Sequence, residues 1–558
     1  MKVKMTEEMI EIMETNPGYS NYTNNSTHKG KKATPRSWLW EHISAEQAAQ
    51  DIWTIVSEAL PTAGTPDYAY NATTARESKA FSSFGPQGGT PPLEQLLPDV
   101  ETNFFKREKT PIFEAPEAWA WEQAVREVKD RFAEVVDPGS TSIWTMERAV
   151  DDMRRRKTLS SNSGYPKFAR RNDTNVTTNA MMTNVREDVT NPHLPATTLV
   201  RNYRGKNRTV WMFPFAVNTY ETQVVAPFFS AMRAVGMDEF SAWKGFSATH
   251  ETVSNETHDP SRAIMATDFA KMDSSFSAET TKEVWRAIAP SYRSADRWDV
   301  WRVTENVHYM PTVTDSQTLI MGHHGVSSGA VPTNDMESTS GTIFCTFVGI
   351  THPEWKTKVT SCMGDDLTIS IAAEFATPET TVEISRLAKT IGLTIHVEKS
   401  SADYNVATVT QRTFARKVVK SKKKAKRNKS RHTAMYPIMR AVNSTTYPEK
   451  VIPKAAWNSD VFCIRAFSIT NNCADHPLFD LAVNWALLGN SNLAEFAAMS
   501  KKEQNEAWRR NKDALDTSYT DDQSTAQADA VDEHFATTPA TAKARETVAQ
   551  VCPVTALP

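Results

Sequence analysis

The chain has 558 residues, 63 of them basic and 66 acidic, and its formal net charge at neutral pH is −3. That length allows several domain-sized units or one large enzyme made of lobes. The balanced charge excludes a protein that binds nucleic acid over its whole surface, so we expect any RNA-binding surface to be local. The five cysteines include no C-x-x-C pair, and they predict neither a zinc site nor a redox motif.

The sequence predicts a soluble intracellular protein. It contains no run of about 18 apolar residues, the length that spans a membrane. The first residues, MKVKMTEEMIEIMETN, carry acidic side chains where a signal peptide needs an apolar core. We therefore expect neither a membrane anchor nor a secretory leader.

The first 215 residues change from a mixed to a basic composition. Residues 1 to about 150 alternate helical stretches with loops rich in Pro, Gly and Asn, and no chemistry is legible there. The basic stretch that follows contains Ser160-Ser-Asn-Ser-Gly-Tyr-Pro166 and Arg201-Asn-Tyr-Arg-Gly-Lys-Asn-Arg208. Basic side chains that alternate along a β-like ribbon can place several donors on one triphosphate, although a solvated basic face is the alternative.

The segment Ala263-Ile-Met-Ala-Thr-Asp268 predicts a buried strand that ends in a carboxylate. A second carboxylate, Asp273, follows after four residues, and Ser277 is placed to cap a helix. Carboxylate oxygens are preferred ligands of Mg²⁺, which usually takes one or two of them and completes its shell with water and phosphate. The segment therefore predicts one half of a metal site, unless these are two ordinary surface acids.

A loop of small residues comes next, Gly325-Val-Ser-Ser-Gly-Ala-Val-Pro-Thr-Asn-Asp-Met-Glu337, and it runs into a helix with an apolar stripe. The N-terminus of a helix favours phosphate, because its free backbone N–H groups and its dipole attract anions. Taken alone, the segment is an ordinary loop.

The strongest local pattern is Val359-Thr-Ser-Cys-Met-Gly-Asp-Asp-Leu-Thr-Ile-Ser-Ile371, which predicts a β-hairpin with Asp365 and Asp366 at its turn. Two metal ions held about 3.5 to 4 Å apart can activate an attacking hydroxyl and stabilise a leaving oxygen. A solvated turn is the alternative for the triplet alone.

The residues after Ala376 predict an amphipathic helix. Thr377 is its expected N-cap and Pro378 its first residue, and Gly392 is placed to end it with a positive φ angle. Its apolar stripe consists of Ile384, Leu387, Ala388 and Ile391.

Beyond residue 415 the chain turns polar. A lysine-rich run follows, and its RNA-binding candidates are Lys422, Lys423, Lys424, Lys426 and Arg427. A localisation signal and a solvated loop are the alternatives for this run. A helical pattern recurs near Leu493 to Arg510, and residues 515–558 hold so few apolar side chains that we expect a mobile tail.

In this order, the acid strand, the Gly/Ser loop with its helix and the Gly-Asp-Asp hairpin resemble motifs A, B and C of the viral RNA-dependent RNA polymerase palm. Ser163, Gly164, Tyr165 and Pro166 resemble the template-guiding motif G, and the basic ribbon resembles motif F. The segment ending in Lys399 resembles motif D, and residues 411–416 stand where motif E is expected. Within the family the chain looks most like the polymerases of picobirnaviruses, followed by those of partitiviruses.

The resemblance implies a role for each matching residue. Asp268, Asp365 and Asp366 are expected to hold two Mg²⁺ ions, for which Mn²⁺ can substitute, and Lys399 to protonate the departing pyrophosphate. The ribose and nucleotide residues are expected to be Asp273, Ser328, Gly329, Thr333, Asn334, Glu337, Arg201, Arg204, Lys206 and Arg208.

The implied fold is an α+β closed right hand with fingers, palm and thumb, in which an antiparallel palm sheet is backed by helices. The expected divisions are fingers in 1–212 and 288–325, palm in 213–287 and 326–415, thumb in 416–514, and the tail in 515–558. RNA template, RNA product and nucleoside triphosphates are the expected partners of a monomer, with viral capsid protein as a further candidate. The expected locations are the virion interior and the host-cell cytoplasm.

One position departs from the family pattern. Many members have Asn four residues after the motif B Thr, where it reads the ribose together with the second motif A Asp. Here that position is Glu337, while Asn334 follows Thr333 directly. Because an ionised Glu can only accept a hydrogen bond, electrostatics favours Asn334, whereas the spacing favours Glu337.

Two other functions remain open from the sequence. A non-catalytic RNA-binding or capsid-associated protein would use the basic stretches, but it has no need of clustered acids, which repel phosphate unless a cation is present. A reverse transcriptase would share the palm chemistry, but it typically carries Tyr-x-Asp-Asp at the hairpin.

Overall fold

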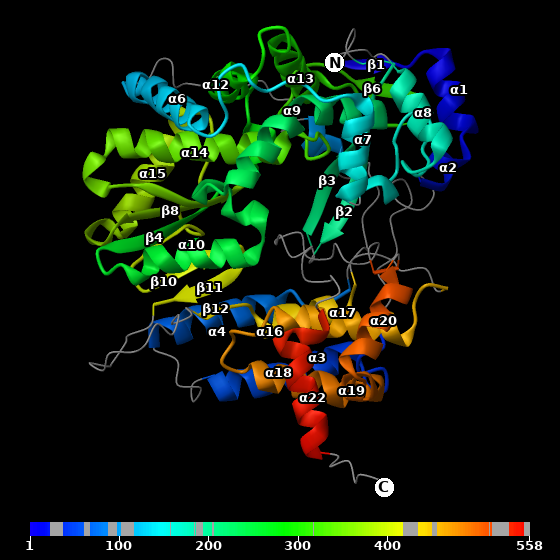
Figure 1. Ribbon diagram of the computed structural model, residues 1–558, viewed down its shortest axis with the longest axis vertical. Coiled ribbons are helices and arrows are strands. Elements are labelled where there is room, and N and C mark those ends of the chain that lie inside the picture. Colours follow the sequence, from blue (N-terminus) through cyan, green and yellow to red (C-terminus); the bar gives the residue numbers. More distant parts are fainter. Residues whose placement is uncertain are drawn as a thin grey trace.

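The computed structural model describes most of the chain. The described residues are 1–22, 37–60, 67–86, 97–101, 116–156, 158–183, 185, 193–203, 206–315, 317–416, 433–448, 455–512, 514–515 and 535–551. Figure 1 shows an upper part of mixed helices and strands above a lower part made mostly of helices. None of the helices in these ranges is long and apolar enough to cross a membrane.

The sheet that carries the candidate acids has four antiparallel strands in the order β7-β8-β4-β9. These strands are β4 (Arg262–Asp268), β7 (Lys358–Met363), β8 (Asp366–Ala372) and β9 (Ser401–Asp403). Every residue of β8 after Asp366 is buried. Since successive side chains of a strand point to opposite faces, the sheet is covered on both sides.

Helices provide that cover. They are α6 (Ala118–Ala133), α10 (Phe246–His258), α12 (Ala278–Ile288), α14 (Thr333–Thr351) and α15 (Pro378–Thr390). α14 packs on β7, α10 packs on β4 and β7, and α6 lies against α12 and α14. In Figure 1, α14 and α15 lie above the strands and α10 lies below them. The predicted antiparallel palm sheet backed by helices is confirmed.

The local signals for α15 and α12 are also confirmed. The Thr377 side chain caps α15 by accepting the N–H of Thr380 at 3.4 Å, and Gly392 follows the helix with a φ of +80°. The predicted stripe of Ile384, Leu387, Ala388 and Ile391 is buried. Ser277 is the N-cap of α12.

A second sheet has five strands in the order β1-β6-β5-β2-β3. They are β1 (Lys2–Lys4), β2 (Ala196–Tyr203), β3 (Lys206–Met212), β5 (Thr312–Val313) and β6 (Thr318–Ile320). The segment after α13 (Arg297–Tyr309) therefore joins the β2–β3 ribbon through β5, and the beginning of the chain pairs with β6 at the far edge of the same sheet. Around the sheet lie α1 (Glu7–Thr15), α2 (Pro17–Tyr22), α7 (Met146–Arg155), α8 (Thr174–Met182) and α9 (Phe215–Val235).

The lower part contains α16 (Ile438–Thr446), α17 (Ser459–Asn471), α18 (Phe479–Gly489), α19 (Ser491–Ala498), α20 (Lys501–Arg510) and α22 (Pro539–Val551). Two helices from the start of the chain, α3 (Ala45–Ala59) and α4 (Asp67–Ser82), lie among them (Figure 1). Side chains from both sets form one hydrophobic core. Residues 37–60 and 67–86, which the sequence predicts to belong to the fingers, thus share their core with the C-terminal helices.

A buried carboxylate fixes α4 to α16. Glu77 accepts the N–H groups of Ile438 at 2.6 Å and Met439 at 2.9 Å, the first residues of α16. The positive end of a helix dipole favours an acidic group at that place. His476 adds its ring Nε2 at 3.2 Å from the same carboxylate. Glu77, from the N-terminal part of the chain, therefore caps a helix that begins 361 residues later.

The expected mobile tail is wrong for residues 535–551. They form a 3-10 turn (Phe535–Thr537) and α22; Phe535, Ala536 and Ala544 belong to the lower core, and Ala540 is also buried. Alanines four residues apart share one face of a helix, and their small size allows a close approach to neighbouring helices. Residues 515–558 contain few apolar side chains in total, so the narrow alanine stripe could not be recognised from composition.

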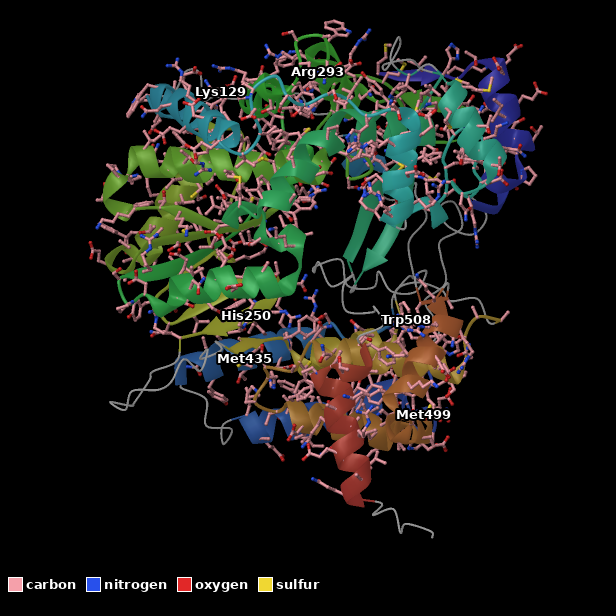
Figure 2. All side chains as sticks on the ribbon, in the orientation of Figure 1. Lys129, His250, Arg293, Met435, Met499 and Trp508 are labelled. Atoms are coloured by element: carbon pink, nitrogen blue, oxygen red, sulfur yellow. The ribbon has the colours of Figure 1, made fainter. Side chains whose placement is uncertain are left out.

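A third sheet, β10 (Val406–Val409), β11 (Arg412–Ala415) and β12 (Thr433–Met435), lies between the two parts. The β10–β11 turn has positive φ at Thr410 and Gln411, as a tight hairpin requires. Figure 2 shows His250 of α10 and Met435 of β12 at this junction. The His250 ring lies 5.7 Å from the Phe414 ring.

Candidate active site

The ends of two strands place three carboxylates at one edge of the four-stranded sheet. Asp268, the last residue of β4, is paired in register with Asp366, the first residue of β8. Asp365 precedes Asp366 in the turn between β7 and β8, and both of these residues are exposed. Gly364 opens the turn with a φ of +63°, a conformation that other residues adopt at a cost.

The beginning of α14 packs against this turn. The N–H of Gly364 donates to Oγ of Ser338 at 2.9 Å. A Cβ atom on Gly364 would lie 2.8 Å from Oδ1 of Asn334 and 3.2 Å from Oε2 of Glu337. Glycine is therefore required here for space as well as for backbone angle. The elements that resemble motifs A, B and C meet at this point.

Asp273 lies on the short helix α11 (Met272–Ser275) and is hydrogen-bonded to Glu337 of α14. Glu337 is 4% exposed, and burial, followed by the charges of Asp273 and Asp365, raises its pKa well above the ordinary value. Two carboxylates can share a hydrogen bond only if one of them holds a proton. Burial beside these charges therefore favours the protonated form of Glu337, in which it can donate to Asp273.

This contact bears on the open question of the ribose reader. The argument for Asn334 assumed an ionised Glu337, which could only accept. A protonated Glu337 donates as an Asn amide would, and it stands at the usual family spacing from Thr333. The structure places both Asn334 and Glu337 beside Gly364, and Glu337 is hydrogen-bonded to Asp273, which supports the family spacing.

The loop before α14 is fixed by close backbone approaches. A Cβ on Gly325 would collide with the backbone of Asp273 and Ser274, and one on Gly329 would collide with the Trp211 carbonyl. Thr333 donates its hydroxyl to the carbonyl of Ser327 at 2.6 Å. Ser328 is exposed at the tip of the loop, where it is accessible to a ligand.

Lys399 lies beside Asp268. Its Nζ is 3.6 Å from Oδ2 of Asp268, and the two side chains are 48% and 49% exposed. The backbone of the same segment is tied to β4, because His396 N–H donates to the Asp268 carbonyl at 2.9 Å and Asp268 N–H donates to Ser400 Oγ at 3.0 Å. The segment that resembles motif D therefore brings a cation to the edge that carries the three carboxylates.

The basic ribbon is the β2–β3 hairpin, in which Arg201 pairs in register with Arg208 and Tyr203 pairs with Lys206. Arg204 lies outside the described residues, as do Lys422, Lys423, Lys424, Lys426 and Arg427. The hairpin confirms the predicted ribbon, while the nucleotide-binding and RNA-binding roles of these residues stay predictions.

The template loop, residues 160–166, rests on the junction between β3 and α9. Phe215 N–H donates to the Ser163 carbonyl at 2.8 Å. Gly164 has a φ of +65°, and a Cβ there would lie 2.9 Å from the Phe213 carbonyl oxygen. Tyr165 and Ser163 are buried. The loop is thus anchored to the same ribbon that resembles motif F.

Sequence reasoning missed Arg76 of α4. Burial lowers the pKa of Arg76, and the negative charge of Asp366 opposes that shift. Its Nη1 donates to Thr408 Oγ1 at 2.9 Å. No local pattern around residue 76 indicates that its charge lies near the hairpin, so only the tertiary structure could reveal it.

The three carboxylates at the sheet edge are ligands of the kind that hard divalent cations prefer. Asp268, Asp365 and Asp366 present only oxygen ligands at one edge, and Lys399 is the cation with a described ion pair to them. Within the described ranges, no three His, Cys, Asp or Glu side chains form a ready-made metal cluster. Mg²⁺ needs only one or two protein carboxylates when substrate phosphate and water complete its shell.

The fold is that of a closed right-hand polymerase, as the sequence predicted. The family model for viral RNA-dependent RNA polymerases matches residues 195–464. A curated relative from a human picobirnavirus, described as a potential RNA-dependent RNA polymerase, is 25% identical over 293 residues, which are 51% of this chain and 51% of the relative. That sequence match therefore spans about half of the relative.

Two solved structures share the fold over nearly the whole chain. The RNA-dependent RNA polymerase of a human picobirnavirus aligns with a TM-score of 0.77 and 18% identity, over 98% of this chain and 100% of that one. An insertion-loop deletion mutant of that polymerase aligns with a TM-score of 0.75 and 17% identity, over 98% and 100% of the two chains. The resemblance to viral RNA-dependent RNA polymerases, and to those of picobirnaviruses among them, is confirmed.

Proposed function

We propose that this chain is an RNA-directed RNA polymerase that copies a viral RNA genome by a two-metal mechanism. The observation that carries the proposal is the meeting of Asp268, Asp365 and the start of α14 at one edge of the palm sheet. The family match and the shared fold support the same function.

Asp268 and Asp365 would bind two Mg²⁺ ions, with Asp366 as a further ligand and Mn²⁺ as a substitute. When bound, these ions lower the pKa of the attacking 3′-hydroxyl and stabilise the leaving pyrophosphate oxygen. Lys399 is positioned by its ion pair with Asp268 and would donate a proton to the departing pyrophosphate. The β2–β3 ribbon would bind the triphosphate, and the template loop would guide the RNA.

Two other functions receive less support. A non-catalytic RNA-binding protein does not account for the acids gathered at the sheet edge, which repel phosphate unless cations are bound. A reverse transcriptase typically carries Tyr at the hairpin position that here is Met363. The capsid partner, the monomeric state and the location in virions and host cytoplasm stay predictions.

A primer-extension assay tests the proposal. Purified protein is incubated with an RNA primer–template and Mg²⁺, and each of the four nucleoside triphosphates is omitted in turn. We expect product that stops before the first template position calling for the missing nucleotide. RNA binding without any extension would support the non-catalytic alternative. Extension only with deoxynucleotides would support a reverse transcriptase.

Ribose selection gives a separate prediction. Glu337→Ala is expected to reduce the preference for ribonucleotides over deoxyribonucleotides by about tenfold, or about 1.4 kcal/mol, because Asp273 loses its hydrogen-bond donor. Glu337→Gln is expected to change the preference less, since an amide also donates. The measurement is the ratio of kcat/KM for ATP and dATP in single-nucleotide extension.

Asn334→Ala is the matched variant for this prediction, since Asn334 contacts the same turn from the same helix. We expect a smaller loss of selectivity than for Glu337→Ala. A collapse of selectivity in Asn334→Ala with an unchanged Glu337→Ala would restore the assignment that the sequence favoured.

A further inference from the structure

The beginning of α9 is unusually polar for a buried helix. Asn218 is 2% exposed and Glu221 is 0% exposed. Residues three positions apart share one helix face, so these two side chains are neighbours. The Asn218 amide donates to Oε2 of Glu221 at 3.1 Å. Buried polar groups of this kind need partners, and their partners come from two different loops.

One side of the pair holds the segment that precedes α14. Asn218 Nδ2 donates to the Gly329 carbonyl at 3.1 Å, and Val331 N–H donates to Oε2 of Glu221 at 2.9 Å. The two side chains thereby fix both ends of residues 329–331. Asp335, within the first turn of α14 itself, pairs instead with Arg233 farther along α9.

The other side of the pair is tied to the template loop through Arg171. Its Nη2 donates to Oδ1 of Asn218 at 2.7 Å, and its Nε donates to the Asn162 carbonyl at 3.1 Å. Its guanidinium also lies over the Phe215 ring, 5.2 Å from the ring centroid. Because a guanidinium can only donate, Arg171 fixes the orientation of the Asn218 amide.

The Asn218 amide is therefore the link between the two loops. Its oxygen accepts from Arg171, and its nitrogen donates to Gly329 and Glu221. Neither an Asp nor an Ala at this position could form both connections. Buried, low-dielectric surroundings strengthen such a chain of hydrogen bonds and make an unpaired member costly.

Burial favours the neutral form of the Glu221 carboxyl group, and glutamine has the same shape and is also neutral. Burial raises the pKa of Glu221 to about 8, against the hydrogen bonds from Val331 and Asn218 and the charge of Arg171. Oε2 accepts both donors, and Oε1 is buried without a partner. Glutamine keeps one acceptor oxygen and is neutral, so Glu221→Gln is the conservative replacement.

Resting on the proposed function, we infer that Asn218 and Glu221 are positioning residues that couple the template loop to the loop before α14. Neither residue belongs to the carboxylate edge or is assigned a contact with RNA or nucleotide. Asn218 and Glu221 fix the position of the template loop relative to α14, the helix that we propose binds the nucleotide. That relation has to be restored after every nucleotide addition, so its loss should affect successive additions more than a single one.

Amide hydrogen exchange tests the coupling without any need for catalysis. Arg171→Lys cannot donate to both Asn162 and Asn218 in the fork geometry of a guanidinium. We expect it to speed exchange of the Val331 N–H by about tenfold, although residue 171 has no described contact with residue 331. Unchanged exchange at Val331, with a changed template loop, would overturn the coupling.

Extension kinetics test its consequence. Asn218→Ala and Glu221→Ala are expected to reduce the number of nucleotides added per binding event by about tenfold, with the first-addition rate within about threefold of wild type. Glu221→Gln should restore most of the loss. The amplitude of the first addition reports the folded, active fraction and separates misfolding from a positioning defect.

Thr219→Val is the matched control, since its side chain lies in the same buried turn and donates to the Phe215 carbonyl of its own helix at 2.7 Å. It should behave like wild type. Equal losses in the first and later additions, or no loss in either Ala variant, would overturn the inference. A wild-type protein that adds no nucleotide would instead contradict the proposed function, and the exchange result would still decide the coupling.

Discussion

Asp365→Asn is expected to abolish nucleotide addition while RNA binding stays largely intact. An amide at this position removes a negatively charged metal ligand from the turn, and with it the charge stabilisation of the transition state. Asp268→Asn should have the same effect, because Asp268 presents the opposing carboxylate from β4. The measurement is the single-turnover extension rate, combined with RNA affinity on the same protein.

Asp366→Asn is expected to be milder. Its negative charge also opposes the lowering of the pKa of the buried Arg76 of α4. Asp403→Asn, at the end of β9 in the same sheet, is the control and should leave the rate unchanged. If Asp365→Asn kept more than about a tenth of wild-type turnover, a barrier change below about 1.4 kcal/mol, the metal assignment would be wrong.

Lys399→Leu is expected to slow the chemical step by about 10²-fold, the low end for the loss of a general acid, with little change in nucleotide affinity. Its ion pair with Asp268 is half exposed and contributes little to stability, so the variant should fold. The single-turnover rate as a function of pH is the measurement. Lys399→His should recover part of the loss, because imidazole can also donate a proton.

Lys389→Leu provides the control for this change, since Lys389 is exposed in the last turn of α15. A pH–rate profile of Lys399→Leu that coincides with wild type would remove Lys399 from the mechanism. His396, which lies in the same segment, or water would then be the proton donor.

The Gly-Asp-Asp hairpin and the acid strand could be predicted because their signals are local. β-prone residues mark β7, alternating apolar residues mark β8, Gly364 supplies the turn angle, and Asp268 ends a buried strand. α15 was equally predictable from its N-cap, its stripe and its terminal glycine. In each case the residues that decide the conformation lie within a few positions of one another.

The parts that the sequence could not predict depend on distant contacts. The charge of Asp366 acts on Arg76, and Glu77 caps α16, only because α4 folds into the lower core. The raised pKa of Glu337 follows from its burial beside Asp273, which no spacing along the chain reveals. α22 was missed because its narrow alanine stripe becomes a packing surface only against α17, α18 and α19.

Counting bound divalent ions tests most directly the claim that Asp268 and Asp365 form the catalytic metal site. Electron paramagnetic resonance would follow a Mn²⁺ titration of the complex with RNA primer–template and a non-hydrolysable nucleoside triphosphate. We expect about two tightly bound Mn²⁺ ions per wild-type complex and weaker or fewer in Asp268→Asn and Asp365→Asn, at equal RNA occupancy. The same number of ions, bound with the same affinity, in wild type and in both variants would contradict the assignment.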